Sequence, residues 1–300
     1  MTPSHAFRFG VVAAMARTAE EWAATARRAE SLGFAILVTP DAFRHSLAPL
    51  PALAAAAAVT RTLRVGTYVI ANDFRHPVLL AKEAATLDLL SGGRFELGMG
   101  AGRPATAEDL RMLGLGFDPG GVRVGRLAES LALLKALLAG RSVTASGPHY
   151  TVTNAEITPR PVQQPRPPIL VAGGRRRLLE LAAREADIVA LGLAPTEPEP
   201  AAAERVGWLR EAAGRRFEEL ELNVNLMAVG QQVPRYISAQ MGVTAQDLAR
   251  AGAVSALTGT PDEMCATLLR RRETLGISYL TVSDELVEPL APVVERLAGR

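Results

Sequence analysis

Short runs of apolar residues alternate along the chain with longer runs in which apolar and polar positions recur at helical spacing. The short runs are rich in Val, Ile, Leu and Phe, which is typical of buried parallel strands, and the longer runs predict amphipathic helices. We therefore expect strands over 7–12, 35–38, 63–70, 94–98, 168–172, 187–191, 221–229 and 278–282. Helices are expected over 19–32, 49–60, 77–91, 126–138, 176–185, 201–217, 261–275 and 285–297.

Eight strand–helix units predict an α/β fold of the (β/α)8 TIM-barrel type, in a single domain over residues 1–300. A doubly wound sheet is the main alternative, but it would carry a nucleotide-binding fingerprint at the first strand–helix turn. The alternation pauses after the fourth strand, between about 100 and 168, and prolines crowd its second part. Because such a density of prolines is excluded from helices and central strands, we expect an insertion region after strand four with a Pro-rich excursion at about 140–168.

Composition narrows the class of protein. Hydrophobic residues make up 48% of the chain and aromatic residues 5%, so aliphatic residues and alanine must fill the core. The net charge is only +2 with both signs interspersed, which argues against a nucleic-acid partner. No apolar run is long enough to cross a bilayer, and Met1–Phe7 lacks the pattern of a signal peptide, so we expect no membrane partner and a cytoplasmic location. A lone Cys265 needs no oxidising compartment.

Barrel active sites form at the carboxyl ends of the strands, so the residues that follow each predicted strand are the candidates for chemistry. After the fourth strand, the glycines between Gly98 and Gly102 do not complete a dinucleotide fingerprint, because Arg103 stands where the third glycine would fall. Missing side chains let a flat ring approach the backbone, but a tight turn explains them equally well. After the fifth strand, Gly173, Gly174 and Arg175 at a helix start predict either an anion site or a solvated, charged turn.

Other polar residues lie in the same kind of loop. Asp73, Arg75 and His76 follow the third strand and could bind a ligand or hold the next helix in place. His45 follows the second strand. No His, Asp or Glu pair has ligand spacing on one helix face, so we expect no metal site.

Several blocks resemble the luciferase-like monooxygenase superfamily, in the right order and over nearly the whole chain. They are 64–67 (RVGT), 75–77 (RHP), 81–88 (AKEAATLD), 91–102 (SGGRFELGMGAG), 159–165 (PRPVQQP), 168–174 (PILVAGG) and 186–189 (ADIV). The variant NDFRHP at 72–77 resembles actinobacterial members grouped as coenzyme F420-dependent oxidoreductases.

This resemblance implies a (β/α)8 barrel with a flavin, or the deazaflavin coenzyme F420, across its C-terminal mouth. The ring would rest on a bulge after strand three, often with a non-prolyl cis peptide, which here would fall near Tyr68–Val69. The resemblance also implies the surrounding residues. Asp41, Ala71, Gly100, Ala101 and Gly102 would line the ring pocket, Arg103 and Thr106 would lie near its edge, and Gly173, Gly174 and Arg175 would bind the phosphate.

Two positions depart from the family pattern. Relatives that use the deazaflavin often carry an Asp-His pair after strand two, whereas this chain has Asp41 and Ala42. An alanine cannot relay a proton, so the sugar-phosphate dehydrogenase form of the chemistry lacks its proton-transfer group. Asp41, His45 and His76 remain candidates, and none is assigned as catalytic. Arg103 stands where a bulky aromatic is common and suggests contact with an anionic substrate or cofactor tail.

The resemblance thus predicts an enzyme that transfers a hydride between F420 and a small organic substrate. One alternative is an FMN-dependent luciferase-like monooxygenase that works with a separate flavin reductase. A second alternative is a non-catalytic barrel that only binds the cofactor. The only partners we expect are a small-molecule substrate and a second copy of the chain, forming a homodimer through the helices over 49–60 and 77–91.

Overall fold

The computed structural model describes residues 5–300 and divides them into two compact units. Of the described residues, the first unit comprises 5–13, Ala24–Leu37 and Ala172–Arg300, and the second comprises Ala14–Ala23 and Val38–Val171. Residues 1–4, on which part of the signal-peptide expectation rests, lie outside the described residues. The single-domain assignment stays a prediction.

One sheet carries the main strands. Its hydrogen-bonded order is β3-β2-β1-β13-β10-β9-β8-β5-β4, and an additional pairing of β3 with β5 closes the order on itself. Strand pairs such as β1 with β13, β10 with β9 and β5 with β8 are parallel. The predicted (β/α)8 barrel is therefore confirmed. The strands are β1 (Arg8–Val12), β2 (Ile36–Thr39), β3 (Arg64–Thr67), β4 (Ile70–Ala71), β5 (Phe95–Gly100), β8 (Ile169–Gly173), β9 (Ile188–Leu191), β10 (Glu221–Leu226) and β13 (Ile277–Ser283).

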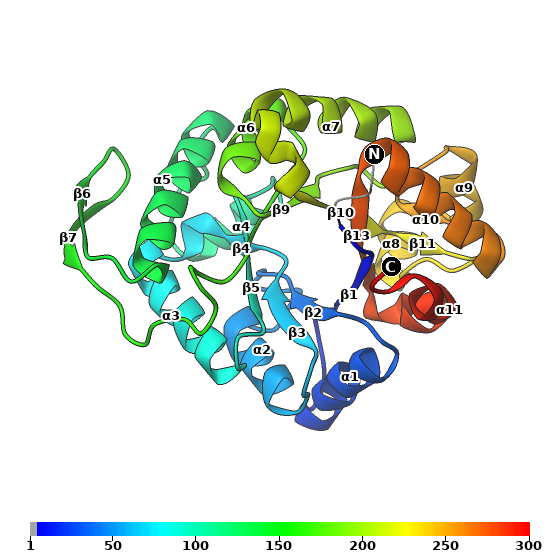
Figure 1. The fold of residues 1–300 in the computed structure, drawn as a ribbon, viewed down its shortest axis with the longest axis horizontal. Coiled ribbons are helices and arrows are strands. Elements are labelled where there is room, and N and C mark those ends of the chain that lie inside the picture. Colours follow the sequence, from blue (N-terminus) through cyan, green and yellow to red (C-terminus); the bar gives the residue numbers. More distant parts are fainter. Residues whose placement is uncertain (1–4) are drawn as a thin grey trace. The chain divides into compact units, whose positions relative to one another are not determined.

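The second unit contains β3, β4 and β5 with the helices that cover them. These are α2 (Pro49–Ala58), α3 (Pro77–Leu90), α4 (Thr106–Met112) and α5 (Gly120–Leu138), with a 3-10 turn η1 (Asn72–Phe74). Figure 1 shows α3 and α5 side by side. The core of this unit is aliphatic, with Leu53, Leu80, Leu97 and Met99 fully buried, as the low aromatic content predicts.

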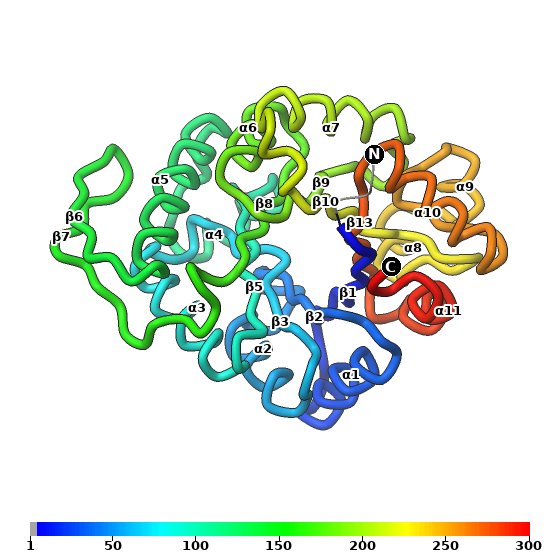
Figure 2. The backbone as a smooth tube through the Cα atoms, in the orientation of Figure 1, coloured from blue at the N-terminus to red at the C-terminus, as the bar shows by residue number. Residues whose placement is uncertain are grey.

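The predicted Pro-rich excursion also belongs to the second unit. It contains an antiparallel hairpin, β6 (Val143–Ser146) and β7 (Thr151–Ala155), which the sequence reading missed because both strands are short and half-exposed. Figure 2 follows this hairpin out past α5 and then back along the extended stretch that leads to β8. Its loop is fastened from inside the unit, because a carboxylate of Glu129 on α5 accepts hydrogen bonds from the backbone amides of His149 and Tyr150.

The first unit carries the remaining helices. They are α1 (Ala19–Ser31, whose N-terminal turns belong to the second unit), α6 (Arg176–Glu185), α7 (Glu199–Ala213), α8 (Arg235–Met241), α9 (Ala245–Arg250), α10 (Pro261–Leu275) and α11 (Val287–Leu297), with 3-10 turns η2 (Gly214–Glu219) and η3 (Asp284–Leu286). Glu199 fastens α7 to α10, since it accepts hydrogen bonds from Arg270 at 2.6 and 2.7 Å and from Arg271 at 2.9 Å. The Arg270 bond, followed by that of Arg271, lowers the pKa of Glu199 to about 2 against the opposing effect of burial.

Two predicted strands are wrong in extent. The run over 63–70 is split into β3 and β4 by an irregular step at Tyr68 and Val69. The run over 221–229 leaves the sheet after Leu226, because the next amides bond to the carbonyl of Ser255 and build a separate pair of β11 (Ala228–Val229) and β12 (Ala256–Leu257). The apolar residues continue across both breaks, and burial alone does not reveal which partner a strand pairs with.

Candidate functional site

The step between β3 and β4 lies under the predicted ring site. The peptide bond joining Tyr68 and Val69 is cis, as the family resemblance predicts. The amide of Tyr68 donates to the carbonyl of Thr39 at 2.9 Å, so the backbone here turns toward β2. On the other side, the Thr67 hydroxyl makes two 2.8 Å hydrogen bonds to the backbone of Gly98.

Gly98 is required at this step by close packing. A Cβ there would lie 2.0 Å from the carbonyl oxygen of Thr67, far inside contact distance. The glycine run that the sequence left open as either a turn or a ring platform thus has, at this position, a backbone-approach role. Two residues after Gly98 on β5, Gly100 lies opposite Ala71 on β4. Both residues belong to the predicted ring pocket.

Asp41 supports the end of this step. Its carboxylate accepts the amide of Ala71 at 3.3 Å and two donors of Arg75, at 2.5 and 3.4 Å, while its side chain is only 8% exposed. Arg75 also lies 3.9 Å from Glu83, and burial raises the pKa of Glu83 despite the neighbouring guanidinium. Asp41 is therefore a fixed carboxylate with both oxygens engaged, and Arg75 is the partner that the sequence suggested only as one member of a polar cluster.

Arg123 is a residue that the sequence reading missed. It lies near the start of α5 and donates through Nη1 to the carbonyls of Ala101 and Gly102, the latter at 2.6 Å. Its Nε donates to the carbonyl of Asp118 at 2.9 Å, and its guanidinium lies 4.1 Å from the ring centre of Phe117. Arg123 thus holds the predicted ring loop, although nothing in its local sequence distinguishes it from a surface arginine.

Arg126, one helical turn further on, performs a similar function for the neighbouring loop. It forms ion pairs with Asp73 at 2.7 Å and with Asp118. Burial works against its charge, but the hydrogen bonds to Asp118 and Asp73 outweigh this effect and raise the pKa of Arg126. Next to Asp73, the side-chain amide of Asn72 donates to the Tyr150 hydroxyl at 3.2 Å. The first two turns of α5 therefore tie together the loops that follow β4 and β5.

A cavity of about 630 Å³ opens beside these loops. That size is in the usual range for a small-molecule site. Its lining brings together three of the predicted residues, Asp41, Arg103 and Thr106. Arg103 and Thr106 are also hydrogen-bonded to each other. The Arg103 amide donates to the Thr106 hydroxyl, and the Thr106 amide donates to the Arg103 carbonyl. The lining is Asp41, Ala42, Arg44, His45, Arg103, Pro104, Ala105, Thr106, Ala107, Glu108, Asp109 and Arg111.

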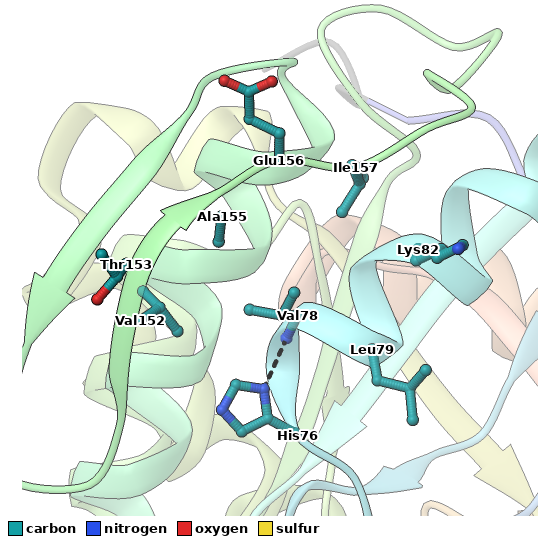
Figure 3. A pocket seen from close by; sticks show the side chains of 9 residues that line it. All are labelled: His76, Val78, Leu79, Lys82, Val152, Thr153, Ala155, Glu156 and Ile157. Atoms are coloured by element: carbon teal, nitrogen blue, oxygen red, sulfur yellow. Dashed lines mark hydrogen bonds between the residues drawn. The ribbon is translucent and has the colours of Figure 1, made fainter.

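The two candidate histidines, His45 and His76, lie in different surroundings. His45 lines the 630 Å³ cavity and has no hydrogen-bond or ion-pair partner among residues 5–300. His76 lines a different, shallow cavity of about 460 Å³ between α3 and β7, shown in Figure 3. There its Nδ1 accepts the Val78 amide at 3.3 Å, which caps α3, and its ring packs edge-on against Tyr150. His76 therefore acts as a helix cap.

The predicted phosphate residues belong to the first unit. A Cβ on Gly174 would lie 2.1 Å from the carbonyl oxygen of Gly192, so β8 and β9 end in close backbone contact. Arg175 precedes α6 and offers no side-chain cap. Its carbonyl accepts the amides of Leu178 and Leu179 at 3.0 Å, so an anion at this helix start would meet the two preceding amides. Arg205 on α7 stabilises this turn, because its Nε donates to the Gly174 carbonyl at 3.2 Å.

Two negative findings apply to the described part of the chain. No group of three or more His, Cys, Asp or Glu side chains within residues 5–300 is placed to hold a metal ion. None of the helices described is long and apolar enough to cross a membrane.

Residues 4–232 match the family model of the luciferase-like monooxygenases, and the chain belongs to this family. Among curated proteins, a 131-residue segment is 40% identical to the F420-dependent glucose-6-phosphate dehydrogenase of Beutenbergia cavernae, covering 43% of this chain and 38% of that protein. Another segment is 35% identical to the 4-hydroxyprotoasukamycin monooxygenase of Streptomyces nodosus subsp. asukaensis, covering 47% of this chain and 35% of that protein.

These matches span less than half the length of either relative. Among solved structures, the coenzyme F420-dependent tetrahydromethanopterin reductase of Methanopyrus kandleri superimposes with a TM-score of 0.78 at 19% identity, covering 98% of this chain and 100% of that one. At that identity the likeness concerns the fold alone. The comparisons thus establish the family, and they include F420-dependent enzymes as well as a monooxygenase.

Proposed function

We propose that this chain transfers a hydride between coenzyme F420 and a small organic substrate. The observation that carries the proposal is a platform at the carboxyl ends of β4 and β5. There Gly98 packs closely against the Thr67 carbonyl, Ala71 pairs with Gly100, and the Asp41 carboxylate accepts the Ala71 amide. In this proposal the small residues of the platform would let a flat ring approach the backbone. The F420-dependent relative of Beutenbergia cavernae supports the choice of cofactor.

The family resemblance assigns residues to such a cofactor. In the second unit, its ring and ring edge would be held by Asp41, Tyr68, Val69, Ala71, Gly100, Ala101, Gly102, Arg103 and Thr106. In the first unit, Gly173, Gly174 and Arg175 would bind its phosphate. When bound, F420 supplies the hydride chemistry, and the protein contributes position and electrostatics.

The chain's own residues have distinct tasks in this proposal. Arg75 and the Ala71 amide hold the Asp41 carboxylate in place, so Asp41 orients the platform and is not available as a mobile base. His76 is engaged in capping α3. Of the three candidates, His45 is left as the group able to hold and release a proton inside the cavity, at the carboxyl end of β2.

Equilibrium titration of the purified chain with F420 and, separately, with FMN tests the cofactor. We expect saturable F420 binding, followed by reduction or oxidation of the bound cofactor with one member of a broad substrate panel. Tight FMN binding with no F420 binding would overturn the proposal and favour the reductase-dependent monooxygenase; the Streptomyces relative is likewise named a monooxygenase. Tight F420 binding with no turnover of any panel member would favour a barrel that only binds the cofactor.

A further inference from the structure

Paired and unpaired charges are unevenly distributed around the 630 Å³ cavity. Three arginines and three carboxylates line it. Two of those arginines share one carboxylate, because Glu108 lies 2.9 Å from Arg44 and 3.6 Å from Arg111. A second carboxylate, Asp41, is neutralised by Arg75, which stands outside the lining. The lining itself is formally balanced, and Arg75 adds one positive charge from outside it, 3.9 Å from Glu83.

Arg103 is the cation that these pairs leave over. Its guanidinium has no hydrogen bond or ion pair to any residue within 5–300. Asp109 is the third carboxylate of the lining, and it forms no ion pair with Arg103. Its backbone, in contrast, is held by Thr106, which accepts the Arg103 amide at 3.2 Å and donates its own amide to the Arg103 carbonyl at 2.8 Å. A fixed backbone with an unengaged guanidinium can bind an incoming anion without first breaking an existing ion pair.

We propose that this cavity binds an anionic group of the substrate, a carboxylate or a phosphate, with Arg103 as the principal contact. The proposal rests on the proposed oxidoreductase function and specifies its substrate class. A guanidinium presents donors in a planar fork that matches both anions, and such charged hydrogen bonds are about twice as strong as neutral ones. Ala42 and His45 line the same cavity, and the methyl side chain of Ala42 occupies little of it. An acidic substrate would thus be anchored at Arg103 with its remainder near the candidate proton carrier.

The cofactor tail is the second source of the same chemistry, and the experiment must separate the two. NMR titrations of the full chain without cofactor would compare benzoate and phenyl phosphate with the uncharged benzamide. Arg103→Met removes the charge at similar length, Arg103→Lys retains it without the fork, and Arg111→Met is the matched control from the same lining. A parallel titration measures the affinity of each variant for F420.

We expect the two anions to bind at least tenfold more tightly than benzamide to the natural chain. In Arg103→Met this preference falls by about 10- to 100-fold, the usual range for a charged hydrogen bond. Arg103→Lys keeps part of it, and Arg111→Met changes it less than about threefold, because an exposed ion pair contributes little. F420 affinity stays within about twofold in Arg111→Met. In Arg103→Met it falls by clearly less than the anion preference, because the other residues proposed to hold the ring are unchanged.

Three outcomes would overturn the inference: equal binding of benzoate and benzamide, equal losses in Arg103→Met and Arg111→Met, or a loss of F420 affinity in Arg103→Met that matches the loss of anion binding. The last result would assign the anion to the cofactor tail. Because the anion titrations contain no cofactor, failure of F420 to bind would reject the proposed function without affecting the anion site.

Discussion

Arg123 offers the most direct test of how the ring loop is held. Replacing it with methionine keeps most of the side-chain length and removes every donor. The natural residue makes hydrogen bonds to three carbonyls, those of Ala101, Gly102 and Asp118, and covers the ring of Phe117. The carbonyl of the buried Ala101 would lose this partner.

The expected magnitude follows from these contacts. A hydrogen bond to a charged group contributes about 1.5 to 3 kcal/mol. Arg123 is only half-buried, so water can replace part of what is lost. We therefore expect Arg123→Met to lower the free energy of unfolding by about 2 to 4 kcal/mol, rather than by the full sum of three bonds. A loosened loop must also be ordered when a ligand binds, and we expect the dissociation constant for F420 to rise by about tenfold or more.

Urea denaturation measures the first effect and fluorescence titration of F420 the second. Arg27→Met is the matched control, because Arg27 is an exposed arginine on α1 without a partner among the described residues. Arg123→Lys should recover part of the F420 affinity, since lysine keeps the charge but not the fork. If Arg123→Met resembles the Arg27 control in both assays, the role assigned to Arg123 is wrong.

Three further predictions follow from other contacts. Gly98→Ala should unfold the chain or abolish F420 binding, because its Cβ would lie 2.0 Å from the Thr67 carbonyl oxygen; circular dichroism and titration separate the two results. Ionised Glu199 stabilises the fold at pH values above its unfolded pKa of about 4.5, and this contribution disappears as the pH falls toward 2. Glu199→Gln should therefore lower the free energy of unfolding by about 2 to 3 kcal/mol at pH 7. Urea denaturation at several pH values should also show that the stability of this variant falls less steeply between pH 4.5 and 2. The expected homodimer would use exposed leucines on α3, so Leu90→Glu, at a side chain 68% exposed, should yield monomers by light scattering without a loss of melting temperature.

Element order was predictable because it depends on local patterns. A strand buried on both faces and a helix buried on one leave different periods in the sequence, and these identified the barrel. Short helices, and a helix start that contains glycines, were not predictable in this way. Helices α4, α8 and α9 have six or seven residues each, too few for a clear period, and α5 begins at Gly120, before the predicted start at 126, because two glycines mask its first turn.

The candidate site shows the same division. The glycines of the two turns, the position of the cis step and the residues around them were predictable from a short contiguous block and its resemblance to a family. The partners of those residues were not. Asp41 and Arg75 are separated by 34 positions and Arg123 lies 21 positions after Gly102. No local pattern distinguishes an arginine that holds a loop from one that faces solvent.

The sequence by itself thus determined the class of fold and the family, because these follow from periodicity and from chain segments whose residues are neighbours. It also supplied the residues expected around a cofactor, which stay a prediction. Only the tertiary structure decided which charges neutralise one another. Both oxygens of Asp41 accept hydrogen bonds, His76 caps a helix, and the Arg103 guanidinium has no partner within residues 5–300. The physical reason is that an ion pair depends on distance in space, and folding brings together side chains that the sequence keeps apart.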